Sequence, residues 1–108
     1  MRLALIDDHE LVREGLAALL AAHAQGVVSV VYSGASLDDA LAAAPTVALL
    51  DVDLGPGSAP VAVSTAALTQ AGAAVLLISA FDDAGSVRAG LRAGALGFVA
   101  KRVSYEAL

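Results

Sequence analysis

Polar side chains that can bind metal ions or phosphoryl groups stand directly after four short apolar segments of the chain. They are Asp7 and Asp8, Asp51, Ser79 and Lys101. Three carboxylates held close together repel one another unless a cation lies among them. Oxygen donors in a chain without cysteine favour a hard ion such as Mg²⁺, which commonly uses one or two carboxylates together with water and phosphate oxygens. The residue types therefore indicate a Mg²⁺ site.

A carboxylate in such a set can also act as a nucleophile toward phosphorus and form an acyl phosphate. Phosphoryl transfer then needs alignment and neutralisation of the charge on the transferred oxygens. Mg²⁺, the Lys101 ammonium and the Ser79 hydroxyl would each contact one of these oxygens. The chemistry predicted from these residue types is phosphorylation of an aspartate.

Five short aliphatic or β-branched segments alternate with segments of helical spacing, in the order βαβαβαβαβ. The five are typical of buried strands and span Leu3–Ile6, Val27–Tyr32, Val47–Leu50, Ala74–Ile78 and Gly97–Ala100. This alternation predicts an α/β fold, a doubly wound five-stranded parallel sheet with helices on both faces. Ligands of such sheets bind beyond the carboxyl ends of the strands, where the polar residues above are placed.

Residues that start and stop helices lie between these strands. Ser36 with Asp39 predicts a capping box, and Asp82 or Asp83 is expected to cap a later helix. Three glycines stand where helices should end, namely Gly26, Gly72 and Gly94.

Each candidate site residue also has a purely structural explanation. An aspartate pair after a strand is often a helix N-cap. Asp51 could belong to a turn before Gly55, Ser79 could cap a helix, and Lys101 could be a solvated surface charge. The functional interpretation gains weight because all of them fall at one edge of the predicted sheet.

The other charged side chains carry weaker signals. His9 and His23 have no partner at a recognisable spacing and are interpreted as a first-turn and a helix-end residue. Arg13, Arg88 and Arg92 are expected on solvated helix faces.

Composition excludes several classes of function. The absence of cysteine rules out disulfides, zinc-thiolate sites and thiol nucleophiles. The net charge of -5 has the wrong sign for binding nucleic-acid phosphates, so DNA binding would need another segment.

The mean hydropathy of +0.78 raises the alternative of a membrane span within Leu54–Phe81, but Pro56, Pro60 and Gly72 favour a helix followed by a buried strand. No signal peptide is recognised, and we expect a cytoplasmic protein without a membrane partner.

Four segments, in order along the chain, resemble the receiver domains of two-component response regulators. They are LALIDDHELVREGL (3–16), VALLDVDLGPG (47–57), VLLISAF (75–81) and AGALGFVAK (93–101). The first segment is most similar to the branch with a LuxR-like helix-turn-helix output domain. The resemblance implies a flavodoxin-like strand order of 2-1-3-4-5.

The same resemblance implies a role for individual residues. Asp51 would be the phosphoacceptor of a sensor histidine kinase, and the signalling domain would not be an enzyme in the ordinary sense. Mg²⁺ would be bound directly by Asp8 and by the backbone carbonyl of Asp53, with Asp7 as a neighbouring or water-mediated ligand. Ser79 and Phe98 would be the switch residues, and Lys101 would contact the phosphoryl group.

The chain departs from the family pattern near its end and in one loop. Arg102 stands where proline commonly follows the lysine, and DLGPGSAP is one residue longer than the usual loop. Taken as one receiver domain over residues 1–108, the chain would hold only the first turn of the fifth helix, from Ser104 to Leu108. We therefore expect apolar surface of the first helix to face water and to favour a homodimer.

Two other functions fit part of the pattern. The segment DVDLG (51–55) resembles the start of haloacid-dehalogenase-type phosphatases, which would turn over a phosphomonoester. A pseudo-receiver would keep the fold and signal without phosphorylation. Phosphorylation of Asp51 by a small phosphodonor in Mg²⁺ would separate the receiver from the pseudo-receiver.

Overall fold

A five-stranded parallel sheet forms the centre of the molecule. The computed structural model describes residues 1–23, 26–55, 57–79 and 84–100. The strands are β1 (Arg2–Ile6), β2 (Ser29–Gly34), β3 (Val47–Asp51), β4 (Ala74–Ser79) and β5 (Gly97–Ala100). Their order across the sheet is β2-β1-β3-β4-β5, as expected for a flavodoxin-like fold. The fold class predicted from the sequence is confirmed.

Helices connect the strands within the described parts of the chain. They are α1 (Glu10–His23), α2 (Leu37–Ala42), α3 (Val61–Gln70) and α4 (Ala84–Arg92). The segment Leu54–Phe81, for which a membrane span is the alternative interpretation, contains α3 followed by β4, as predicted. Among the described residues, no helix has both the length and the apolar character needed to cross a membrane. The expected first turn of a fifth helix and the caps at Asp82 or Asp83 lie outside the described residues.

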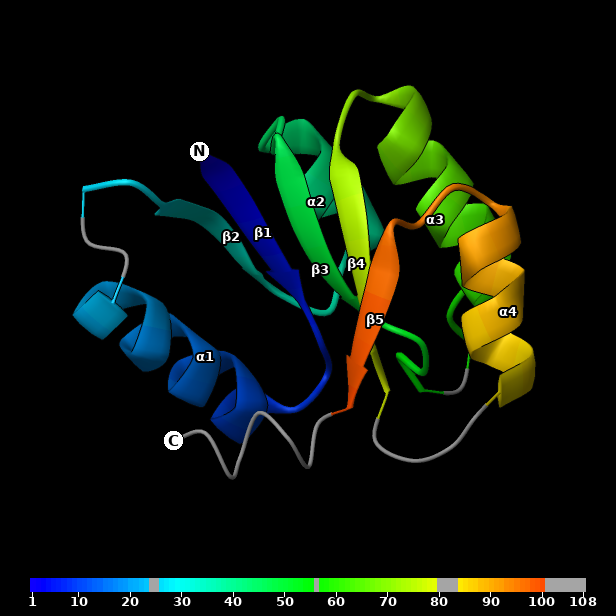
Figure 1. Cartoon of the computed structure of the whole chain (residues 1–108), viewed down its shortest axis with the longest axis horizontal. Coiled ribbons are helices and arrows are strands. Elements are labelled where there is room, and N and C mark those ends of the chain that lie inside the picture. Colours follow the sequence, from blue (N-terminus) through cyan, green and yellow to red (C-terminus); the bar gives the residue numbers. More distant parts are fainter. Residues whose placement is uncertain (24–25, 56, 80–83, 101–108) are drawn as a thin grey trace.

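Side chains of alternate strand residues form the main core on one face of the sheet. Ala4, Ile6, Leu50 and Leu77 belong to one buried cluster, which also includes Leu68 of α3. Figure 1 shows α3 and α4 side by side over this part of the molecule, with α1 on the other side of the sheet. Strand residues alternate between the two faces, so this cluster accounts for one face only.

The face toward α1 is less completely covered. Leu3 and Leu5 are buried there, but Leu49 and Leu76 in the neighbouring strands are only partly buried. On α1, Val12 is buried, whereas Leu16, Leu19 and Leu20 are partly exposed. Apolar side chains of α1 thus retain partial contact with water, while the incomplete fifth helix and the association of two copies stay predictions.

At the start of α2, only one of the two hydrogen bonds of the predicted capping box forms. The Ser36 Oγ accepts a hydrogen bond from the Asp39 N–H at 3.2 Å, as predicted. The Ser36 N–H, however, donates to the Tyr32 hydroxyl at 2.8 Å, where a full capping box would use the Asp39 side chain. A side chain from β2 therefore completes the cap.

Two helix ends follow the predicted pattern. Gly72 and Gly94 come shortly after α3 and α4 and have φ angles of +95° and +121°. This left-handed conformation is accessible to glycine at little cost and ends a helix cleanly.

Leu68→Ala should strongly destabilise this fold, because Leu68 is fully buried in the core cluster. Removing a buried leucine side chain costs about 2–5 kcal/mol through lost transfer energy and the cavity left behind. Urea unfolding followed by circular dichroism would measure the change. Leu11→Ala is the matched control, since Leu11 is also helical but 78% exposed, and it should change stability by less than about 0.5 kcal/mol. Equal losses in both variants would contradict the packing of α3 described above.

Candidate functional site

The register of the three central strands brings their carboxyl ends together. Ile6 of β1 pairs with Leu50 of β3, so Asp7 and Asp51 follow at the same level of the sheet. Asp51 in turn pairs with Ile78 of β4, and Ser79 is the next residue. The sheet therefore gathers residues that are distant in the sequence at one edge.

Asp7, Asp8 and Asp51 form an acidic cluster at this edge. Asp7 and Asp51 are buried, with 0% and 3% exposure, and the Asp8 side chain is one-third exposed. Together with His9 they offer four possible metal-ligand atoms that all lie within 4.8 Å of one another. Oxygen-rich donor sets of this kind suit a divalent cation. The residues present thus fit the cation expected from the sequence.

Backbone N–H groups orient two of the carboxylates. The His9 N–H donates to Asp7 Oδ1 at 2.8 Å, and the Asp53 N–H donates to Asp51 Oδ1 at 3.0 Å. The Asp7 carboxylate therefore accepts a hydrogen bond in the turn that leads into α1, which agrees in part with the interpretation of the aspartate pair as a helix N-cap. The same carboxylate also belongs to the acidic cluster.

The loop between β3 and α3 passes close to Asp8. A Cβ built on Gly55 would lie 3.3 Å from Asp8 Oδ2, and Gly55 has a φ angle of +92°. Asp53, which lies between Asp51 and this glycine, is exposed, and its Oδ1 accepts from the Gly55 N–H at 3.0 Å. One oxygen of the Asp53 carboxylate is thus engaged in the loop, and the ligand role of the Asp53 backbone carbonyl stays a prediction.

His9 was interpreted from the sequence as a first-turn helix residue without a partner, and this is wrong. It precedes α1, its carbonyl accepts from the Arg13 N–H at 3.1 Å, and its ring lies beside the acidic cluster. The His9 Nδ1 is 3.0 Å from Asp7 Oδ1 and 2.9 Å from Asp8 Oδ1. The available signal was its position directly after the aspartate pair.

Arg13 also differs from its predicted place on a solvated helix face. The residue is partly buried, and its Nη1 donates to the backbone carbonyl of Asp7 at 2.7 Å. A guanidinium from the first turns of α1 thus holds the chain at the end of β1. No spacing rule connects Arg13 to Asp7, because the contact depends on the turn between β1 and α1.

The predicted switch residues lie on adjacent strands at different depths. Ser79 ends β4 and is 2% exposed, whereas Phe98 in β5 is 56% exposed. Ser79 pairs with Ala100, the last residue of β5, and Phe98 pairs with Leu77. Lys101 follows Ala100 in the sequence, but Lys101 and Arg102 lie outside the described residues.

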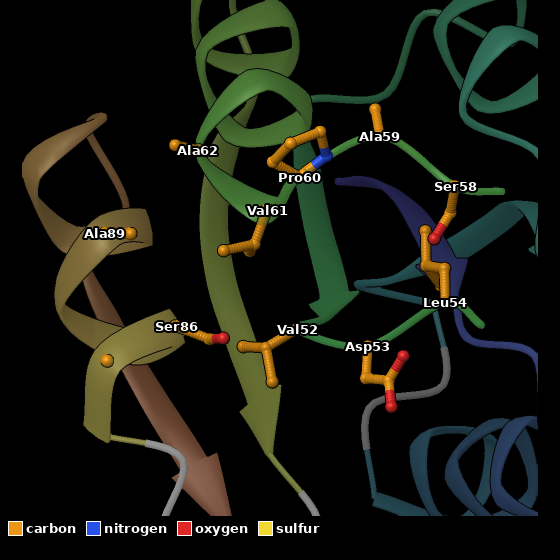
Figure 2. Close-up of a pocket in the computed structure, with 11 residues that line it drawn as sticks. Val52, Asp53, Leu54, Ser58, Ala59, Pro60, Val61, Ala62, Ser86 and Ala89 are labelled. Atoms are coloured by element: carbon orange, nitrogen blue, oxygen red, sulfur yellow. The ribbon is translucent and has the colours of Figure 1, made fainter. Parts of the chain in front are cut away.

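A cavity of about 370 Å³ opens beside the acidic site. It lies between the loop after β3, the start of α3 and α4, and Figure 2 shows Asp53 at one side and Ser86 of α4 at another. In the same view, the Ser86 hydroxyl points toward Val52. Space therefore separates the beginning of α4 from the loop that follows Asp51.

A five-stranded sheet of this order, with carboxylates at the ends of its first and third strands, has the architecture of a signalling receiver. The sequence matches the response regulator receiver domain family over residues 3–108. The chain belongs to this family. The matched residues include the segment 51–55 that resembles the start of haloacid-dehalogenase-type phosphatases.

Solved structures of receiver domains agree with this assignment. The signal receiver domain of the putative response regulator NarL from Mycobacterium tuberculosis is 39% identical, with a TM-score of 0.76 over 93% of this chain and 82% of that one. A LuxR-family two-component response regulator from Aurantimonas is 27% identical, with a TM-score of 0.74 over 93% and 73%. The response regulator ChrA of a heme-sensing two-component system is 31% identical, with a TM-score of 0.71 over 93% and 48%. No curated protein sequence matches the chain significantly.

Arg13→Ala should destabilise the fold by about 1.5 kcal/mol, because a hydrogen bond with a charged donor stabilises a protein by roughly 1.5–3 kcal/mol and Arg13 is only partly buried. Arg88→Ala, at an exposed position of α4, is the control and should lie within about 0.5 kcal/mol of the parent. Urea unfolding would measure both. If Arg13→Ala were as stable as Arg88→Ala, the contact with Asp7 would have no structural importance.

Proposed function

We propose that the chain is the phosphoacceptor domain of a response regulator and is phosphorylated on Asp51 by a sensor histidine kinase. The observation that carries this proposal is the placement of buried Asp51 next to Asp7 and Asp8 at the carboxyl edge of the sheet. Family membership supports the same role. The chain would act in the cytoplasm.

Mg²⁺ is the proposed cofactor, held by carboxylate oxygens of Asp8 and Asp51 and the backbone carbonyl of Asp53, with Asp7 nearby. When bound, the ion would neutralise charge on a phosphoryl oxygen and offset the repulsion among the carboxylates. The chain's own contribution is to hold the Asp51 carboxylate as the nucleophile, with Oδ1 fixed by the Asp53 N–H. Ser79 and Lys101 are the proposed contacts of the remaining phosphoryl oxygens.

Phosphorylation would be transmitted by a change at Ser79 and Phe98. Charge-assisted contacts from Ser79 and Lys101 would favour one arrangement of the strand ends over the other. In this proposal the exposed Phe98 side chain moves inward when Ser79 contacts the phosphoryl group. We further propose that the output is transcription, through a separate DNA-binding domain, because LuxR-family regulators are among the similar proteins.

Asp51→Asn should abolish phosphorylation by a small phosphodonor such as acetyl phosphate in Mg²⁺, because the amide cannot form the acyl phosphate. Mass spectrometry of the intact chain would detect the added phosphoryl group. Asp38→Asn, at an exposed position of α2, is the matched control and should retain full labelling. Stoichiometric labelling of Asp51→Asn would refute the assignment, and no labelling of the parent chain would favour a phosphorylation-independent receiver.

Because the chain contains no tryptophan, Phe98→Trp would introduce a single fluorescent reporter of the switch. Beryllofluoride with Mg²⁺ should shift its emission to shorter wavelength, since the side chain would leave water. Adding Lys101→Ala should weaken the shift more than it weakens beryllofluoride binding, because the lysine couples the bound group to the switch. An unchanged spectrum at saturating beryllofluoride would rule out the inward movement of residue 98.

A further inference from the structure

The His9 imidazole lies at the open side of the acidic cluster. Its Nδ1 is 2.9 Å from Asp8 Oδ1, 3.0 Å from Asp7 Oδ1 and 3.8 Å from Asp51 Oδ2. The His9 side chain is 60% exposed, whereas those of Asp7 and Asp51 are almost fully buried. The ring therefore stands between the buried carboxylates and solvent.

These distances fit a set of ligands around one ion. Neighbouring ligands of an octahedral ion at about 2.1 Å lie about 3.0 Å apart, and opposite ligands lie about 4.2 Å apart. In a tetrahedral site at about 2.05 Å the separation is about 3.3 Å. Two of the Nδ1–oxygen distances, 2.9 and 3.0 Å, are close to the separation of neighbouring octahedral ligands, and the third, 3.8 Å, lies between the neighbouring and the opposite separations. The whole donor set lies within 4.8 Å, slightly wider than the separation of opposite ligands. Small side-chain rotations would bring the four donors to one ion.

The backbone of His9 is anchored on both sides. Its N–H donates to Asp7 Oδ1 at 2.8 Å, and its carbonyl accepts from the Arg13 N–H at 3.1 Å. Since this part of the chain is held by the start of α1, the imidazole can reach the cluster by rotation of its side chain alone. Ligands positioned in advance lower the cost of metal binding.

We propose that His9 Nδ1 is a ligand of the cation site and shifts its preference from Mg²⁺ toward Co²⁺, Ni²⁺ and Zn²⁺. The inference rests on the proposed function, in that it takes the acidic cluster to be a working cation site. Carboxylate and water ligands suit Mg²⁺, whereas imidazole suits first-row transition metals. A transition metal bound there would occupy the position next to Asp51 and compete with Mg²⁺.

Co²⁺ is a suitable probe, because it is paramagnetic and shifts the resonances of protons near its ligands. The chain would be prepared without a polyhistidine tag, as the parent, as His9→Ala and as His23→Ala. His23 is exposed in the last turn of α1 and is the matched control. Proton NMR would show a shifted resonance of a carbon-bound imidazole ring proton in the parent and in His23→Ala, and its loss in His9→Ala.

Calorimetry with Co²⁺ and with Mg²⁺ would give the second readout. In His9→Ala the Co²⁺ affinity should fall on the order of tenfold or more, while the Mg²⁺ affinity should change less than about threefold. His9→Gln, which keeps a side chain of similar length, should behave like His9→Ala. It also guards against a loss of folding in the alanine variant, which circular dichroism would reveal.

The two ways of failing are distinct. If Co²⁺ and Mg²⁺ both bind but no imidazole resonance appears, or both metals lose affinity equally in His9→Ala, the ligand role of His9 is overturned and the proposed phosphoacceptor site stands. If neither metal binds the parent chain, the acidic cluster is not a cation site, and the Mg²⁺-dependent function fails with it.

Discussion

The parallel pairing of β1 with β3 is the constraint on which the site depends. Ile6 and Leu50 are partners in this register, so Asp7 and Asp51 are brought together where the strands end. Two carboxylates buried at one place repel each other and lose hydration, which is costly unless donors or a cation compensate. The structure supplies part of this compensation through the N–H groups of His9 and Asp53. A divalent cation would add to this compensation.

The elements around this edge differ in how firmly they are held. The face covered by α2, α3 and α4 contains a continuous buried cluster that includes Leu50 and Leu77. α4 lies especially close to β4, because a Cβ on Gly90 would lie 2.5 Å from Leu77 Cδ1. The start of α4 nevertheless borders the cavity near Val52. α4 is thus tightly packed against β4 at Gly90 and borders a cavity at Gly85 and Ser86.

β4 and β5 offer a short path from the site to the surface. Ser79 is buried at the end of β4, and Phe98 in the neighbouring strand is exposed. A change in the hydrogen bonding of Ser79 would act on a strand that is paired directly with the one carrying Phe98. This proximity gives the proposed switch a physical connection without requiring a long chain of contacts.

Local sequence patterns were sufficient for most of the elements. Apolar runs and helical spacing predicted all five strands and the helices between them, because burial on a sheet or a helix face leaves a short-range period. β5 has the predicted bounds. β2 spans Ser29–Gly34 where Val27–Tyr32 was predicted, because pairing with β1, from Arg2 with Ser29 to Ile6 with Gly34, decides where this strand begins and ends.

What the sequence alone determined about the site was its set of residue types at the strand ends, including Asp7, Asp8 and Asp51. Strand alternation predicts that parallel strands share one carboxyl edge, so these residues could be grouped without coordinates. Only the tertiary structure decided the places of His9 and Arg13. Their contacts depend on how the chain turns from β1 into α1, and a turn of three residues leaves no periodic signal in the sequence.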